Sequence, residues 1–168
     1  LREISVDFRI VSETHNMKGI IDKTTCVAKI LGVNDELLDL KIRELRSNIE
    51  KLKKTKMLVK KKKQKLLILM MRGTSPIIAG SNTAGDGFIQ MTGNLNAFSD
   101  VEGWKPVGIE SILSIDPDVI ILTKRGFSGF ENTSDFLAQS GLSLTKAGKT
   151  GALICLLYTS DAADDRGC

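Results

Sequence analysis

The segment from residue 103 to residue 123 constrains the fold of this chain more than any other part of the sequence. It runs Gly-Trp-Lys-Pro-Val-Gly-Ile-Glu-Ser-Ile-Leu-Ser-Ile-Asp-Pro-Asp-Val-Ile-Ile-Leu-Thr. Ile109 and Ile112 share one face at helical spacing, and Pro117 ends that helix because it lacks a backbone donor. The apolar run over 119–122 is typical of a strand covered on both faces. The segment therefore predicts a helix, a break and a buried parallel strand.

The rest of the chain continues this alternation of strand-like and helix-like segments. In chain order we expect a strand over 4–10, a helix over 17–31, a long helix with a basic turn over 34–63, a strand over 66–71, a helix over 83–93, a helix over 133–139 and a strand over 152–154. A hydrophobic content of 42% fits an ordinary globular chain. Strands that alternate with helices predict a three-layer α/β sandwich with a largely parallel sheet.

The two helices before residue 64 carry apolar residues at helical spacing. The face that we expect the first helix to bury consists of Ile20, Ile21, Val27, Ile30 and Leu31. The apolar stripe of the second helix consists of Leu38, Ile42, Leu45, Ile49 and Leu52. Asn34 or Asp35 can cap the start of the second helix. The stripe predicts a long helix that packs along one side.

Several motifs of this chain resemble one known family. The pattern Pro-x-x-x-Glu-x-x-x-x-x-x-Pro-Asp-Val-Ile, which begins at Pro106, is similar to the C-terminal lobe of the binding proteins that feed ABC importers of haem, iron-siderophores and cobalamin. The motifs that most resemble haem (hemin) binders are Ala79-Gly80-x-x-Thr83-Ala84, Gly93-x-x-Asn96-Ala97, Gly103-Trp104-Lys105-Pro106 and Lys124-Arg125-Gly126. The resemblance covers roughly residues 10–151.

The resemblance implies how the chain is divided. Residues 1–33 would be the end of an N-terminal lobe with its connecting helix, 34–63 a long bridging helix with a basic turn, and 64–154 an incomplete C-terminal α/β lobe. A bridging helix implies small hinge motion, although a plain packing helix fits the same sequence. Residues 155–168 resemble the translation of a sequencing adapter, and we expect them to be read-through. We also expect that an N-terminal lobe preceded Leu1.

Candidate ligand-binding residues follow from the ends of the predicted strands. In open α/β sheets, ligands lie beyond the carboxyl ends of the strands, which here are 72–75 and 124–126. The predicted ligand-binding residues are Arg72, Thr74, Ser75, Thr83, Trp104, Lys124, Arg125 and Gly126. Arg125 could pair with a haem propionate, or it could be a surface arginine. Trp104 could stack on the porphyrin, or it could pack in the core.

Thr83 opens the predicted helix over 83–93 and has a separate rationale. With Asp86 three residues later it forms the pattern of a capping box. The free amides at the start of that helix could hold a carboxylate, and a haem propionate is such a group. The resemblance implies that the iron-ligating tyrosine comes from the N-terminal lobe. We therefore expect no metal ligand in this chain, and haem only as the transported ligand.

Glu110 matches an acidic residue that, in the family, pairs with arginines of the membrane permease. The alternative is a glutamate in the first turn of a helix, where the helix dipole favours negative charge. The resemblance further implies an ABC permease and ATPase complex as partners, a monomeric protein, and a periplasmic location or an extracellular lipoprotein anchored to the membrane. Siderophores and cobalamin are alternative ligands of the same class.

Two features bear on other classes of function. His15 is the only histidine, so a zinc cluster or a His-based catalytic triad cannot be assembled, and we expect no enzyme. Nine lysines lie between Lys51 and Lys65, which would suit a basic module associated with nucleic acid. No arginine or aromatic residue interrupts these lysines, and cations favour the end of a helix, so a solvated helix end is the preferred interpretation.

Overall fold

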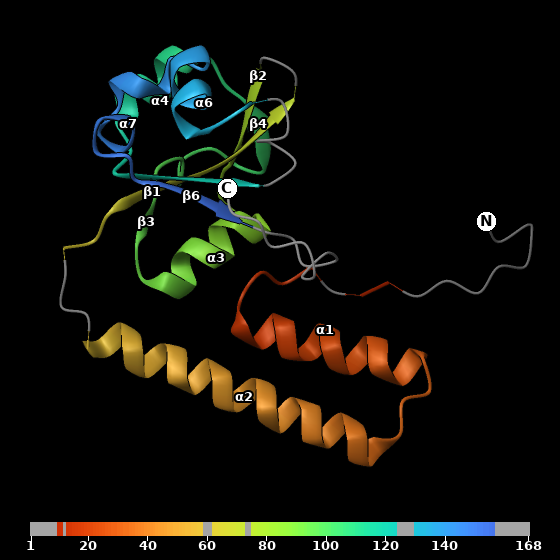
Figure 1. Cartoon of the computed structure of the whole chain (residues 1–168). Coiled ribbons are helices and arrows are strands. Elements are labelled where there is room, and N and C mark those ends of the chain that lie inside the picture. Colours follow the sequence, from red (N-terminus) through yellow and green to blue (C-terminus); the bar gives the residue numbers. More distant parts are fainter. Residues whose placement is uncertain (1–9, 12, 59–61, 73–74, 124–129, 157–168) are drawn as a thin grey trace, which may run out of the picture. The chain divides into compact units, whose positions relative to one another are not determined.

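The structure is a computed structural model that describes residues 10–11, 13–58, 62–72, 75–123 and 130–156. Two compact units make up the chain, with their boundary between Lys60 and Lys61. The first unit contains a pair of helices, and the second contains a sheet covered by helices (Figure 1). Residues 4–9 of the strand predicted over 4–10 lie outside the described part of the chain.

The first unit is built from α1 (Met17–Ile30) and α2 (Asp35–Leu58), which pack against each other. Each helix has an asparagine at its start. The side-chain oxygen of Asn16 accepts a hydrogen bond from the amide of Gly19 at 2.9 Å, and that of Asn34 accepts one from the amide of Leu37 at 2.9 Å. These bonds satisfy backbone donors that the first helical turn leaves without partners. Asn34 is thus the cap of the long helix.

The buried face predicted for α1 is largely wrong. Four of its five residues are exposed: Ile20, Val27, Ile30 and Leu31. On α2, Leu38 and Ile49 are buried as the stripe predicts, but Leu52 is 60% exposed. The reason is geometric, because within this unit α1 packs against one helix and a single neighbour covers only the seam between the two. The apolar spacing identified the face but not the extent of its burial.

The second unit has a mixed, mostly parallel sheet. Its strands are β1 (Lys65–Arg72), β2 (Ser75–Ala79), β3 (Leu95–Asn96), β4 (Trp104–Pro106), β5 (Val119–Thr123) and β6 (Leu153–Leu156). The order is β4-β2-β1-β5-β6, and β3 also pairs with β1. Strands β3 and β5 run parallel to β1, and β6 runs parallel to β5, while β2 is antiparallel to both β1 and β4. This lobe confirms the predicted α/β class.

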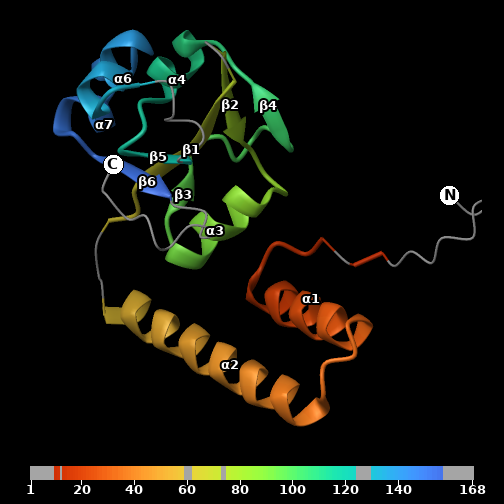
Figure 2. The ribbon, with the colours of Figure 1, turned by 45° about the vertical axis from the view of Figure 1, so that its right-hand side comes forward.

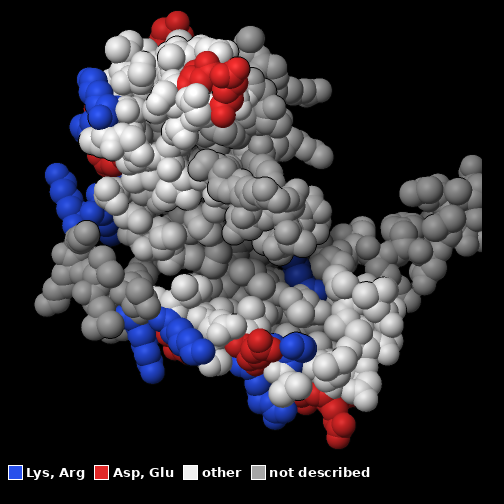
Figure 3. Space-filling model, in the orientation of Figure 1, with Lys and Arg blue, Asp and Glu red and all other residues white. Residues whose placement is uncertain are grey.

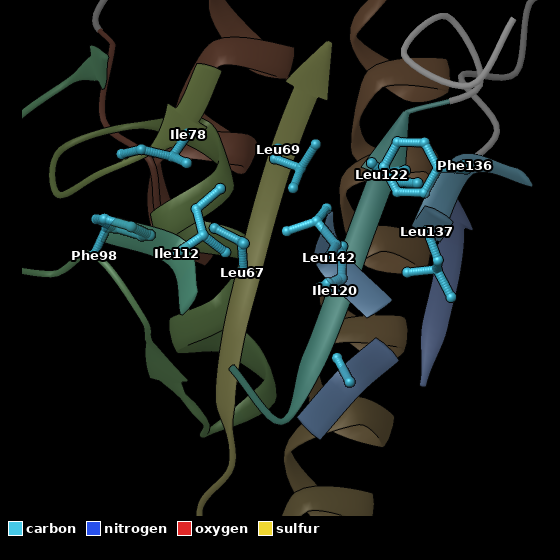
Figure 4. Close-up of a cluster of buried hydrophobic side chains, with 11 residues drawn as sticks. Leu67, Leu69, Ile78, Phe98, Ile112, Ile120, Leu122, Phe136, Leu137 and Leu142 are labelled. Atoms are coloured by element: carbon cyan, nitrogen blue, oxygen red, sulfur yellow. The ribbon is translucent and has the colours of Figure 1, made fainter. Parts of the chain in front are cut away.

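Helices cover both faces of this sheet (Figure 2). On one face lies α3 (Ala84–Thr92), and on the other lie α4 (Ile109–Ile115), α6 (Thr133–Gln139) and α7 (Lys146–Thr150). Successive residues of a strand point to opposite faces, so the continuous apolar sequence of β1 serves both layers. Leu67 and Leu69 join the larger core under α4 and α6 (Figure 4), whereas Leu66 and Ile68 join a smaller core under α3.

The junction between α4 and β5 follows the prediction closely. Helix α4 ends at Ile115, and Asp116 adopts a left-handed backbone with φ of 51°. A carboxylate oxygen of Asp116 accepts a hydrogen bond from the amide of Lys146 at 2.7 Å, and one of Asp118 accepts from the amide of Lys65 at 2.8 Å. The two aspartates around Pro117 thus tie β5 to α7 and β1, which gives the Asp-Pro-Asp sequence a structural role.

Two segments predicted as loops are strands. Arg72 is the last residue of β1, Ser75 and Pro76 begin β2, and Arg72 pairs with Ser75 in the antiparallel ladder of the two strands. Trp104 begins β4, the edge strand beside β2, and pairs with Ala79. The proline at position 76 led to the loop prediction, but proline is tolerated near the start of a strand. At the other edge, the strand predicted over 152–154 is β6 (Leu153–Leu156), whose last two residues belong to the segment expected to be read-through.

Candidate functional site

A pocket of about 220 Å³ lies between the sheet and the start of α3. Its lining residues are Ile68, Ala84, Gly85, Phe88, Trp104, Thr123 and Leu156. Thr123 and Leu156 are the last residues of the parallel strands β5 and β6. The pocket therefore lies at the carboxyl end of the parallel strands, where open α/β sheets bind ligands.

Two partly exposed aromatic side chains line this pocket. Trp104 on β4 and Phe88 on α3 are each 38% exposed. Aromatic rings that remain exposed in an apolar pocket can lie against a flat or apolar ligand. The sequence predicted Trp104 but not Phe88. The sequence offers no signal that separates Phe88 from a core residue, and only the structure shows it exposed between the buried Gly87 and Ile89.

Close packing of α3 on β2 forms one wall of the pocket. A Cβ atom on Gly85 would lie 2.6 Å from the Cβ of Ala79, so only glycine allows this approach. The hydroxyl of Thr83 accepts a hydrogen bond from the amide of Asp86 at 3.1 Å and donates one to the carbonyl of Gly80 at 2.7 Å. Thr83 is 3% exposed, and its hydroxyl is used by these two contacts. Its geometry is that of a helix cap.

The predicted capping box is only half formed. The carboxylate of Asp86 accepts hydrogen bonds from the amide nitrogens of Asn96, at 3.0 Å, and Gln90, at 2.8 Å. Asn96 also donates to the carbonyl of Ala79 at 3.0 Å and accepts from the amide of Phe98 at 3.0 Å. The side chain of Asn96 therefore joins α3, β2 and the segment after β3. Thr83 and Asn96, both from the resemblance motifs, hold the wall of the pocket in place.

Most of the other predicted ligand residues fall outside the described part of the chain. Thr74, Lys124, Arg125 and Gly126 lie outside the described residues, as does the side chain of Arg72. Ser75 is exposed and lines a different hollow. The pocket thus brings Trp104 together with the start of α3, the helix that Thr83 caps. Thr123, which also lines the pocket, directly precedes Lys124 in the sequence.

The second hollow surrounds Glu110, which is exposed in the first turn of α4. It has a volume of about 360 Å³. Its lining residues are Met71, Ser75, Pro76, Val107, Gly108, Ile109, Glu110, Gln139, Ser140 and Leu142. The hollow therefore combines one carboxylate with neutral polar groups and an apolar floor, whereas the pocket at Trp104 is almost entirely apolar.

The family model described as periplasmic binding protein matches residues 2–156. The chain belongs to this family. Proteins of the family bind solutes for transport, which agrees with the resemblance found in the motifs. No protein with a curated function matches the sequence.

Solved structures similar to this family member include several haem binders. The apo haem-binding protein RhuT from Roseiflexus sp. RS-1 has 25% identity and a TM-score of 0.80 over 93% of this chain and 59% of its own. BhuT, solved with two hemes, has 22% identity, a TM-score of 0.81 and the same coverage of both chains. The vitamin B12 binding protein BtuF of Vibrio cholerae has 15% identity and a TM-score of 0.72 over 92% of this chain and 57% of its own. The chain thus spans less than two thirds of these proteins.

The charges of this periplasmic binding protein are mixed over its helical pair. Figure 3 shows basic and acidic side chains interspersed over this helical pair. On α2, Glu50 pairs with Lys53 at 2.7 Å. Over the described residues, no group of three or more His, Cys, Asp or Glu side chains could hold a metal ion. None of the helices in that part of the chain is both long and apolar enough to cross a membrane.

Proposed function

We propose that this chain is the bridging helix and C-terminal lobe of an ABC-importer binding protein that captures haem and delivers it to a membrane permease. The observation that carries the proposal is the aromatic pocket of Trp104 and Phe88, which lies at the carboxyl end of the parallel strands in a lobe of the periplasmic binding protein family. In this proposal α2 is the bridge, and the protein acts in the periplasm or as a lipoprotein anchored at the cell surface.

The pocket is small and apolar, which favours a ligand that also contacts a second binding surface. Its volume of about 220 Å³ is below the roughly 300–1,000 Å³ of pockets that enclose a drug-sized ligand, so it would cover only part of one. A planar porphyrin presents an apolar face to Trp104 and Phe88, while Arg72, Lys124 and Arg125 are the proposed partners of its carboxylates. Siderophores and cobalamin are the alternative ligands, and BtuF shows that a B12 binder shares the fold.

Hemin titration of the whole chain tests this proposal. Trp104 is the only tryptophan, so bound haem should quench its fluorescence while the haem absorbance changes in parallel. Followed by absorbance, Trp104→Ala and Phe88→Ala should each weaken binding by roughly threefold to tenfold, because an aromatic contact contributes about 0.5–1.5 kcal/mol. Leu144→Ala is the control, since Leu144 is 64% exposed and outside the pocket. Tighter binding of cobalamin or a ferric siderophore than of hemin would overturn the choice of haem.

Glu110 is the proposed contact with the permease. A charged pair at the edge of an interface changes the rate of association more than the final affinity. Glu110→Gln should therefore slow association with the permease and ATPase complex in lipid nanodiscs severalfold at low salt, and the effect should shrink as salt is added. Asp100→Asn, another exposed acidic residue of the lobe, is the control and should leave the rate unchanged. Equal rates for Glu110→Gln and wild type would exclude this role.

A nucleic-acid module built on Lys51–Lys65 is the alternative from another class. The described lysines of this run are exposed at 51, 53, 54, 62, 63 and 65. Membership of a solute-binding family and the acidic residues interspersed along α2 favour transport. Duplex DNA binding with a steep salt dependence, abolished by Lys62→Gln with Lys63→Gln, would favour the alternative. Haem binding should not respond to those two substitutions.

A further inference from the structure

The turn between β2 and α3 is hydrogen-bonded to the segment that precedes β4. The amide of Gly80 donates to the carbonyl of Gly103 at 3.0 Å, and the amide of Ser81 donates to the carbonyl of Val101 at 2.7 Å. In the opposite direction, the amide of Gly103 donates to the carbonyl of Ser81 at 2.9 Å. We call this set of backbone hydrogen bonds the clamp. It holds two segments of the lobe together that are about twenty residues apart in the sequence.

The clamp connects the two elements that carry the aromatic side chains of the pocket. Trp104 directly follows Gly103 and begins β4, whereas Phe88 lies on α3, which begins four residues after Gly80. Both elements leave the clamp within a few residues. A change in the spacing of the clamp therefore moves Trp104 relative to Phe88. The geometry of the pocket thus depends on contacts made by residues that do not line it.

Gly80 allows the two backbones of the clamp to approach each other closely. A Cβ atom at this position would overlap the carbonyl oxygen of Val101 and would lie 2.8 Å from that of Gly103. Both oxygens belong to the backbone, so neither can move aside as the end of a flexible side chain would. The carbonyl of Gly80 also accepts a hydrogen bond from the hydroxyl of Thr83, the cap of α3, at 2.7 Å. Gly80 therefore contacts the start of α3 on one side and the segment before Trp104 on the other.

A side-chain hydrogen bond links the same two segments at the surface. Nδ2 of Asn82 donates to Oε1 of Glu102 at 3.3 Å, and both residues are exposed. Asn82 has a left-handed backbone with φ of 59°, a conformation that asparagine and aspartate tolerate better than most other residues with a side chain. This link offers a way to disturb the clamp without a change in the core.

We propose that Gly80 is a positioning residue of the ligand pocket, because its close contact with residues 101–103 fixes Trp104 relative to Phe88 before a ligand binds. The inference rests on the proposed function of that pocket. A pocket formed in advance loses less conformational freedom on binding, which favours affinity. Its fixed walls also favour a flat, rigid ligand over one that requires them to move apart. Asn82 and Glu102 support the same contact from the surface.

Acrylamide quenching of Trp104 fluorescence tests the positioning without any ligand, since Trp104 is the only tryptophan. Gly80→Ala forces the clamp apart, so the quenching constant should rise by up to about 2.6-fold, the ratio of full exposure to the present 38%. Gly148→Ala is the matched control. A Cβ atom there would overlap the carbonyl oxygen of Leu142, which strains the lobe at a glycine outside the pocket. Its quenching constant should equal that of the wild type.

Hemin titration then connects the positioning to the ligand. Followed by haem absorbance, Gly80→Ala should weaken binding by roughly threefold to tenfold, because a displaced ring loses its contact with the ligand. In the Phe88→Ala background the same substitution should cost less, since only one aromatic ring is left to position. A residue that merely stabilises the lobe would give costs that add. Gly148→Ala should bind hemin as the wild type does at temperatures where both are folded.

The link between Asn82 and Glu102 provides a second test, which also applies if Gly80→Ala does not fold. Asn82→Asp keeps a residue that tolerates the left-handed backbone but places two carboxylates against each other. It should raise the quenching constant and weaken hemin binding by about twofold to fivefold. Addition of Glu102→Gln should restore both, because the glutamine amide can donate to the new aspartate. Glu102→Gln alone should resemble the wild type.

Two results would overturn the positioning role. One is an unchanged quenching constant in Asn82→Asp and in every folded Gly80 variant, and the other is an equal cost of Gly80→Ala with and without the ring of Phe88. The proposed function has a separate outcome. If the wild-type chain does not bind hemin but the quenching constants respond as expected, the clamp stands as the device that positions Trp104 and the choice of haem fails.

Discussion

The α/β lobe and the α1–α2 pair are both built from amphipathic segments, yet they bury these segments to different extents. In the lobe, β1 and β5 lie between two layers of helices, and Leu67 and Ile120 are fully buried. In the pair, α1 packs against one helix, and Leu31, at its end, is 73% exposed. Spacing in the sequence decides which face is apolar. The number of packed neighbours decides how much of that face leaves water.

The largest difference between the two regions should appear on truncation of apolar side chains. Phe136 is fully buried in the lobe, with its ring edge-to-face to Phe130 at 4.9 Å between centroids. Phe136→Ala should lower the free energy of unfolding of the lobe by about 3–5 kcal/mol. Leu31→Ala in the pair should change stability by less than about 0.5 kcal/mol. Urea titration followed by Trp104 fluorescence reports on the lobe, and circular dichroism reports on the helices. Similar costs for the two variants would contradict the comparison.

The polar network behind the pocket should show a smaller but clear effect. Asn96 is buried and donates to Asp86 and to the carbonyl of Ala79, so Asn96→Ala leaves two buried acceptors without their donor. We expect a loss of about 1–3 kcal/mol in the urea titration. Gln90→Ala is the matched control, because Gln90 donates to the same carboxylate but is exposed, and water can replace it. The prediction fails if the two variants are equally stable.

Both regions contain a helix capped by a side chain, so the same kind of hydrogen bond can be compared in the lobe and in the helical pair. The Thr83 hydroxyl caps α3, is buried and also donates to the carbonyl of Gly80. Asn34 caps α2 at an exposed position. Removal of a cap costs about 0.5–2 kcal/mol, and we expect Thr83→Ala near the top of this range and Asn34→Ala near the bottom. Thermal unfolding by circular dichroism and by Trp104 fluorescence separates the two. A costlier Asn34→Ala would reverse the expected order.

The sequence predicted the features that depend on residues close together in the chain. It did not predict those that depend on contacts between distant segments. The unit from α4 to β5 was predictable, because Pro117 and the apolar run after it act within a few residues. The hairpin of β1 and β2 was not, since Pro76 suggested a loop and only pairing with β1 makes the segment a strand. The exposure of α1 was also unpredictable, because it depends on which elements pack against the helix.

The candidate site shows the same limit. Trp104 was found through a motif, whereas Phe88 was missed because a phenylalanine in an amphipathic helix is expected to face the core. Ser75 was assigned to the ligand edge on the assumption of a loop, and the hairpin places it at the hollow of Glu110 instead. Thr83 was a candidate contact, and its hydroxyl is used within the fold. The motifs thus include one residue that lines the pocket and one that supports its wall, and they do not separate the two kinds.

Two carboxylates with lowered pKa values extend the comparison to charge. The pKa of Glu50 on α2 is lowered mainly by a hydrogen bond from the ammonium of Lys53, at 2.7 Å between the two atoms. The pKa of Asp116 in the lobe is lowered mainly by a hydrogen bond from the backbone amide of Lys146, also at 2.7 Å. A lowered pKa in the folded state means that each carboxylate stabilises the fold above its unfolded pKa. That stability is lost as pH falls through the folded pKa.

Salt should distinguish these two carboxylates, and this is the smallest effect that we expect. The pair of Glu50 and Lys53 is exposed, so about 1 M salt, which shortens the screening length to about 3 Å, should return the pKa of Glu50 toward its ordinary value. The amide of Lys146 is held in place by the start of α7, so Asp116 should keep most of its lowered pKa. NMR titration of the two carboxyl carbons at low and high salt measures both pKa values.

Asp116→Asn should remove one acid-dependent step from the stability of the lobe, whereas Glu50→Gln should leave the stability of the lobe unchanged. An equal salt response of the two groups would show that Asp116 depends on the lysine charge rather than on the fixed backbone donor.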